Sequence, residues 1–112
     1  MKKILFVDDS RDTANALRDI ACGLGRFSAV AYTGASAVDA AASEAFDVIF
    51  LDLMLPDADG LDVCLDIRRG GSKSARIVAL TGSNELIDKS QPCVDEWVLK
   101  PLHMDQLERL LR

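Results

Sequence analysis

Short apolar runs alternate along the chain with stretches in which apolar residues recur every three or four positions. The apolar runs have the length of strands and lie at residues 4–7, 29–32, 48–51, 77–80 and 94–99. The stretches between them predict helices around residues 14–24, 35–44, 61–67 and 104–111. A further, short helix is expected within residues 84–90, because Pro92 limits it to about two turns.

The alternation of strands and helices favours a doubly wound α/β fold built on one parallel sheet. Strands that are apolar throughout are typical of a sheet covered by helices on both faces. Right-handed connections between five such strands predict a flavodoxin-like (βα)5 arrangement with strand order 2-1-3-4-5 and, in this chain, a shortened fourth helix. Ligands of such sheets bind beyond the carboxyl ends of the strands, so chemistry is expected there.

The length and composition are those of one small globular domain. The chain has 112 residues, 49% of them apolar, which predicts a single domain over residues 1–112 and no effector domain in this chain. No apolar run approaches the roughly 20 residues of a membrane span, and the first residues lack the pattern of a signal peptide. A formal charge of -5 argues against direct nucleic-acid binding and favours cations or proteins as partners.

The cysteine pattern indicates a reducing compartment. Cys22, Cys64 and Cys93 are odd in number and widely spaced, which argues against a disulfide framework. None of them has a second ligand at the spacing of a metal site. We therefore expect three small buried hydrophobic side chains in a cytoplasmic protein.

Four of the predicted strands end in residues that can carry chemistry. Asp8 and Asp9 follow the first strand, Asp52 the third, Thr81 the fourth and Lys100 the fifth. A parallel sheet brings these ends to one edge, where three carboxylates repel one another and require a cation. Oxygen ligands without histidine or cysteine point to Mg²⁺. A magnesium site beside an ammonium group and a hydroxyl suits phosphoryl transfer with a carboxylate as nucleophile.

The chain contains neither of the glycine-rich signatures that hold nucleotide phosphates, so we do not expect a bound nucleotide to be the phosphoryl donor. Instead, it resembles the response-regulator receiver domains (CheY-like) of two-component and phosphorelay signalling over essentially its whole length. The resemblance rests on Asp8-Asp9, on the Asp-x-x-x-Pro-x-x-x-Gly spacing within residues 51–60, on residues 79–82 and on Lys100-Pro101.

The resemblance implies a phosphoacceptor and a set of metal ligands. Asp52 would accept a phosphoryl group from a phosphohistidine on a histidine kinase or a histidine phosphotransfer protein. Asp9 would ligate Mg²⁺ directly, and Asp8 mainly through water. Asp52 itself and the main-chain carbonyl of Met54 would complete the protein ligands.

The resemblance also implies a switch and a docking surface. Thr81 and Lys100 would bind phosphoryl oxygens, while Thr81 and the indole of Trp97 would move on phosphorylation. The residues expected to contact the phosphohistidine partner are Ala14, Leu17, Pro101 and Leu102. Two alternatives stay open: Leu17 wholly in the core, and Trp97 packed permanently against the short fourth helix.

Two departures from the family pattern affect the expected behaviour. The short fourth helix puts family-style dimerisation in doubt, so we expect a monomer or a weak dimer. The apolar side chain of Met54, two residues after the acceptor, offers an attacking water no strong hydrogen bond, so slow autodephosphorylation is expected. The acidic residues at positions 57, 59, 62 and 66 are interpreted as a loop and a solvated helix face, and His103 is not assigned a catalytic role.

Two other functions compete with the phosphoacceptor. A small phosphohydrolase could use Asp52 covalently, but the haloacid-dehalogenase pattern requires a second aspartate at the position of Met54, and the chain has no room for a cap insertion. A pseudo-receiver would keep the fold as an interaction scaffold, but it would not need the acidic pair, the acceptor, the hydroxyl and the lysine together.

Overall fold

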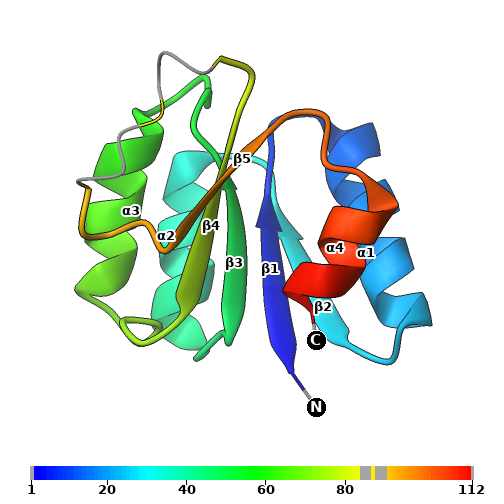
Figure 1. The fold of residues 1–112 in the computed structure, drawn as a ribbon. Helices are drawn as coiled ribbons and strands as arrows, with labels where there is room; N and C mark the ends of the chain where they lie inside the picture. Colours follow the sequence, from blue (N-terminus) through cyan, green and yellow to red (C-terminus); the bar gives the residue numbers. More distant parts are fainter. Residues whose placement is uncertain (1, 84–86, 88–90, 112) are drawn as a thin grey trace.

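The computed structural model describes residues 2–83, 87 and 91–111, and five strands in this part of the chain form one parallel sheet. The strands are β1 (Lys3–Val7), β2 (Phe27–Ala31), β3 (Val48–Asp52), β4 (Arg76–Thr81) and β5 (Glu96–Leu99). They pair in the order β2-β1-β3-β4-β5 (Figure 1), which confirms the predicted topology. The direction of winding reverses between β1 and β3, so the site is expected beyond the carboxyl ends of these two strands.

Four helices in the described residues cover the sheet from both sides. They are α1 (Arg11–Gly23), α2 (Gly34–Ser43), α3 (Gly60–Arg68) and α4 (Met104–Leu110). The helices α1 and α4 lie on one face, and α2 and α3 on the other (Figure 1). Alternate residues of β1 therefore enter different cores: Leu5 and Val7 pack with residues of α2 and α3, while Ile4 and Phe6 pack with residues of α1 and α4. This two-sided burial explains why the strands are apolar throughout.

Polar side chains begin α1 and α2 by binding main-chain N–H groups. The hydroxyl of Ser10 accepts from the N–H of Thr13 at the start of α1, and the hydroxyl of Thr33 accepts from the N–H of Ser36 at the start of α2. The helix expected within residues 84–90 lies, apart from Ile87, outside the described residues. Within the described ranges, no helix combines the length and the apolar character that a membrane crossing requires.

The fifth strand begins later than its apolar pattern predicts. Strand pairing starts at Glu96, opposite Val78, and not at residue 94. Just before Glu96, the side chain of Asp95 binds the neighbouring strand: its carboxylate accepts a hydrogen bond from the main-chain N–H of Ile77 at 2.8 Å. The second strand begins earlier than predicted, at Phe27, because its pairing with Lys3 extends the sheet edge.

One of the three cysteines does not have the predicted environment. Cys22 is exposed near the end of α1, with its Sγ 3.3 Å from the hydroxyl of Ser28, so its assignment to the core was wrong. Cys64 and Cys93 are buried as predicted. The Cys64 thiol donates to the main-chain carbonyl of Cys93, and its burial raises the pKa of Cys64.

Candidate functional site

The residues predicted to carry chemistry meet at the carboxyl edge of the sheet. Asp52 and Thr81 are the last residues of β3 and β4, whereas Asp8 and Lys100 directly follow β1 and β5. Parallel strands end at the same edge, which is why these positions converge although they lie far apart in the sequence. The side chains of Asp8, Asp52 and Thr81 are buried, and Asp9 is exposed to solvent at the rim.

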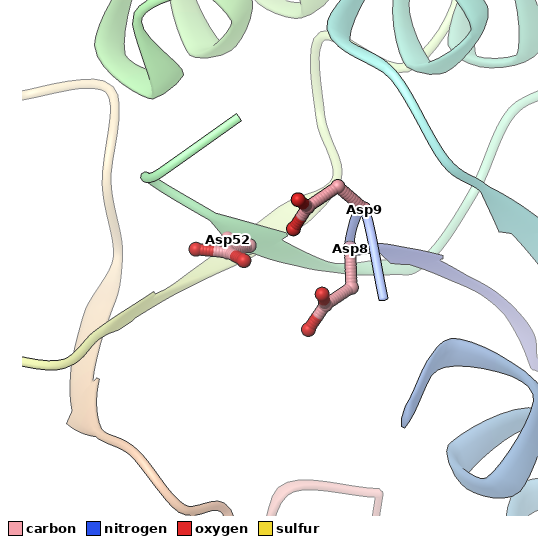
Figure 2. A group of neighbouring side chains, drawn as sticks. All are labelled: Asp8, Asp9 and Asp52. Carbon is pink, nitrogen blue, oxygen red and sulfur yellow. The ribbon is translucent and has the colours of Figure 1, made fainter. Parts of the chain in front are cut away.

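Three carboxylates form the centre of this site. Asp8, Asp9 and Asp52 lie side by side beyond the ends of β1 and β3 (Figure 2). Each offers an oxygen, and these oxygens lie within 4.8 Å of one another. Two carboxylates about 4 Å apart repel by roughly 4 kcal/mol at an effective dielectric constant near 20. The three oxygen donors fit a hard divalent cation such as Mg²⁺, which takes one or two carboxylates and keeps several water ligands.

Lys100 partly neutralises this acidic centre. Its Nζ donates to Oδ2 of Asp52 at 2.8 Å and lies 3.5 Å from Oδ2 of Asp8. Burial alone would lower the pKa of the Lys100 ammonium, but the hydrogen bond and charge of Asp52, with a smaller effect of Asp8, raise this pKa overall. Lys100 is therefore a stable cation at neutral pH, placed directly on the carboxylate of Asp52.

Burial of Asp8 makes its ionised form less favourable than it would be in water. Burial raises the pKa of Asp8, and the charge of Asp52 acts in the same direction. The main-chain N–H of Ser10, which donates to Asp8 Oδ1 at 2.9 Å, and the ammonium of Lys100 only partly offset these effects. A buried carboxylate whose ionised form is incompletely compensated is a natural ligand for a cation or for water around one.

The loop after β3 is closely tied to Asp52. The N–H of Met54 donates to Asp52 Oδ1 at 2.9 Å, and Met54 forms a β-bridge with Asp59 across the loop. Gly60 lies so close to Leu53 that a Cβ would come within 2.5 Å of the Leu53 Cα. The glycine of the predicted motif is thus required by a close approach of the main chain, and the Met54 side chain stays 66% exposed.

Thr81 and Trp97 lie on neighbouring strands at this edge. The Thr81 side chain is fully buried, and its hydroxyl is within 3.2 Å of both the main-chain N–H and the carbonyl of Ser83. Trp97 pairs with Ala79 of β4 and packs, partly buried, against the core on the α2 and α3 side of the sheet. Both residues are therefore near the carboxyl edge, and the hydroxyl of Thr81 binds the main chain of Ser83.

A hollow of about 420 Å³ adjoins the acidic centre. Its walls include Thr13 and Leu17 of α1 together with Pro101 and Leu102 after β5. Three of the four predicted partner residues are thus accessible together at this surface. Ala14 is fully buried, so its prediction as a contact residue was wrong: its side chain turns toward the core, and Thr13 takes its place at the surface.

The remaining candidate groups lie apart from the acidic centre. Asp62 and Asp66 are exposed on α3, and Asp59 begins this helix by accepting from the N–H of Leu61. His103 begins α4, where its N–H donates to the side chain of Gln106. Asp57 has a specific role that its position in an acidic loop did not indicate: its carboxylate accepts from two main-chain N–H groups of α2.

Known proteins are similar to this chain in sequence and in structure. The chain matches the response regulator receiver domain over residues 4–112. It is 36% identical to the transcriptional regulatory protein KdpE of Mycobacterium tuberculosis, over 100% of this chain and 50% of the relative. The chain spans about half the length of the curated relatives it matches.

Two solved structures are similar to the chain over almost its whole length. The response regulator TrrA of Thermotoga maritima, in complex with Mg²⁺ and BeF, aligns with a TM-score of 0.86 and 31% identity, covering 99% of this chain and 96% of that one. A complex of the histidine kinase ThkA with TrrA aligns with a TM-score of 0.84 and 32% identity over the same shares. Given the sheet order, the acidic centre with its lysine and the family match, the chain belongs to the response regulator receiver domains, the phosphoacceptor modules of two-component signalling.

Proposed function

We propose that Asp52 is the phosphoacceptor and that its donor is a phosphohistidine on a histidine kinase or a histidine phosphotransfer protein. The observation that carries this assignment is the buried carboxylate of Asp52, which lies 2.8 Å from the Lys100 ammonium and beside Asp8 and Asp9. In the transfer, an Asp52 oxygen forms a bond to phosphorus while the bond from phosphorus to the imidazole nitrogen breaks. The electron pair of the broken bond stays on the imidazole nitrogen.

The other residues of the site balance charge and bind oxygens. Asp9 and Asp52 would hold Mg²⁺ with the main-chain carbonyl of Met54, and Asp8 would bind it mainly through water. When bound there, Mg²⁺ neutralises negative charge on the phosphoryl oxygens. Lys100 supplies a second positive charge. The hydroxyl of Thr81 would exchange its contacts with Ser83 for a phosphoryl oxygen, which couples phosphorylation to β4.

The product of this reaction stays on the protein, so the domain acts as a switch and not as a turnover enzyme. Hydrolysis of the aspartyl phosphate requires an oriented water. The exposed Met54 side chain, two residues after Asp52, offers such a water no strong hydrogen bond, and slow autodephosphorylation follows. The proposed location of the protein is the cytoplasm. Its cysteines form no disulfide, and two of them, Cys64 and Cys93, are buried, which is typical of a protein in a reducing compartment.

Intact mass spectrometry tests the phosphoacceptor directly. Incubation with Mg²⁺ and a small phosphoramidate donor should add one phosphoryl group to the wild type and none to Asp52→Asn. Steady release of phosphate from phosphoesters would instead indicate a hydrolase. No modification under any of these conditions would indicate an interaction scaffold.

The metal assignment has its own test. Asp9→Ala removes an exposed carboxylate without disturbing a buried contact, and we expect it to abolish phosphorylation at millimolar Mg²⁺. Asp12→Ala is the matched control, because Asp12 is a nearby exposed carboxylate in the first turn of α1. If Asp9→Ala is phosphorylated as fast as the wild type, the metal ligands are assigned wrongly.

The hollow beside the acidic centre is the proposed docking surface for the phosphohistidine partner. Leu17, Pro101 and Leu102 line it next to Lys100. Leu17→Asp should slow phosphoryl transfer from a phosphorylated partner protein while leaving phosphorylation by the small donor unchanged. Leu65→Asp is the control, since Leu65 is an exposed leucine on α3, on the opposite face of the sheet. Equal transfer rates in both folded variants would exclude Leu17 from the interface.

A further inference from the structure

The carboxylate of Asp57 joins two segments that are distant in the sequence. Its Oδ1 accepts from the N–H of Gly34 at 2.8 Å, and its Oδ2 accepts from the N–H of Ala35 at 3.1 Å. Both donors belong to the first turn of α2, whose N–H groups have no partner within the helix. These two hydrogen bonds also lower the pKa of Asp57, so the side chain is ionised at neutral pH.

The packing around Gly34 shows how close the two segments are. A Cβ at Gly34 would lie 2.8 Å from Cγ2 of Val63 and 3.1 Å from the Cβ of Ala58. Only glycine allows this approach without displacing the loop or α3. The start of α2 is therefore pressed against the β3–α3 loop (residues 53–59), and Asp57 fastens the loop there.

The same loop is closed at its base by main-chain contacts. The N–H of Gly60 donates to the carbonyl of Leu53 at 3.3 Å, and Met54 forms its bridge with Asp59. Asp57 lies at the far end of the loop from this base, where its carboxylate attaches the loop to the start of α2. With both ends held, the main chain at Met54 has one defined position beside Asp52.

We propose that Asp57 is a positioning residue for the metal site, because its attachment to α2 holds the β3–α3 loop and with it the main-chain carbonyl of Met54. This inference rests on the proposed function, in which that carbonyl is a magnesium ligand. The two hydrogen bonds of the Asp57 carboxylate go to α2 and not to the acidic centre. Removal of the Asp57 carboxylate therefore weakens metal binding by releasing the loop, and it also destabilises the first turn of α2.

Thr33 provides a matched control for the effect on the helix. Its hydroxyl accepts from the N–H of Ser36 at 3.1 Å, so Thr33 also stabilises the first turn of α2. Unlike Asp57, Thr33 directly precedes α2 in the sequence, so its hydrogen bond stabilises the helix without attaching the β3–α3 loop to it. Thr33→Ala and Asp57→Ala should both weaken the start of α2, but only Asp57→Ala should release the loop.

The test is an NMR titration of each protein with Mg²⁺ alone, in parallel with hydrogen exchange of the Gly34 and Ala35 amides and with urea unfolding. We expect Asp57→Ala to weaken Mg²⁺ affinity roughly tenfold, the low end of the usual cost of losing a partner that orients a ligand. Thr33→Ala should bind Mg²⁺ like the wild type at a similar loss of stability. Asp57→Asn, which keeps one acceptor oxygen, should restore part of the affinity.

Two results would overturn the role of Asp57. One is unchanged Mg²⁺ affinity in Asp57→Ala although the Gly34 and Ala35 amides have lost protection; the other is an equal loss of affinity in Thr33→Ala. Asp9→Ala in the same titration separates this failure from failure of the proposed function. If Asp9→Ala also binds Mg²⁺ like the wild type, the metal site and the role of Asp57 are both wrong. If only Asp9→Ala loses affinity, the metal site stands and the role of Asp57 is wrong.

Discussion

Asp8 is a buried carboxylate whose charge the fold compensates only in part. Burial raises the pKa of Asp8, so the folded protein binds this proton more tightly than the unfolded chain does. Its favourable contribution to folding is therefore complete only below the pKa of the unfolded chain, and it is lost as the pH rises through the higher pKa of the folded state. At neutral pH without a bound cation, the ionised carboxylate opposes folding.

Asp8→Asn should consequently stabilise the metal-free protein. We expect the free energy of unfolding at neutral pH in EDTA to rise by about 1 kcal/mol, a typical size for a single substitution. The gain should shrink as the pH falls toward about 4, where the aspartate of the unfolded chain also becomes protonated. Urea titrations over this pH range measure both effects. Asp12→Asn is the control, and a stability of Asp8→Asn at or below that of the wild type at neutral pH would contradict the prediction.

At the scale of elements, Arg68 holds the segment that leads into β5. Its guanidinium donates to the main-chain carbonyls of Cys93 and Lys73, and to that of Ala75 just before β4. It also pairs with the carboxylate of Asp95 at 2.7 Å, and Asp95 in turn accepts from the N–H of Ile77. One side chain of α3 thus positions the approaches to two strands that end at the acidic centre.

Removal of this side chain should cost far more than removal of its neighbour. Arg68→Ala removes the guanidinium from the partly buried carbonyls of Ala75 and Cys93 and from the Asp95 carboxylate, which we expect to lower the free energy of unfolding by about 3 kcal/mol. Arg69→Ala should change it by less than about 0.5 kcal/mol, because the Arg69 side chain is 78% exposed and its ion pair is with the exposed Asp66, three residues earlier. Urea unfolding of the two variants decides; equal effects would mean that Arg68 is not a structural anchor.

At the scale of the whole molecule, β4 and β5 connect the acidic centre at the carboxyl edge to the face of the sheet that α2 and α3 cover. Thr81 pairs with Leu99, and the N–H of Lys100 donates to the Thr81 carbonyl at 2.8 Å. Trp97 precedes Lys100 on β5 and packs against the α2 and α3 side of the sheet. A movement of the Thr81 hydroxyl toward a phosphoryl group on Asp52 would therefore alter the packing beside Trp97. The phosphoryl group drives this movement if it binds more tightly to the moved position of Thr81 than to the original one.

Intrinsic fluorescence reports this movement, because Trp97 is the one tryptophan in the sequence. We expect beryllofluoride with Mg²⁺ to change the emission intensity or maximum of the wild type, and Thr81→Ala to reduce the change. Asp52→Asn under the same conditions controls for effects of the additives. An unchanged spectrum in protein that mass spectrometry shows to be phosphorylated would mean that Trp97 stays packed and is not part of the switch.

The sheet order and the carboxyl-edge residues could be predicted from the sequence because they depend on local patterns. Each strand is an apolar run, each strand end is a polar residue directly after it, and the connections between parallel strands have one hand. Asp8, Asp52 and Thr81 were placed at one edge by this reasoning, and the structure has them there. The residues of the receiver motif then indicated the family, and the comparisons confirmed it.

Only the tertiary structure decided which side chains from distant segments meet. The spacing of α1 predicted an apolar face, but the packing of that face buries Ala14 and leaves Cys22 exposed. Asp57 looked like a solvated loop residue, and Arg68 carried no signal at all. Their partners lie at residues 34–35 and 73–95, and no periodicity within one segment describes a contact with another. Such contacts arise when the sheet brings its connections together, because each buried main-chain group then requires a partner from whichever segment lies beside it.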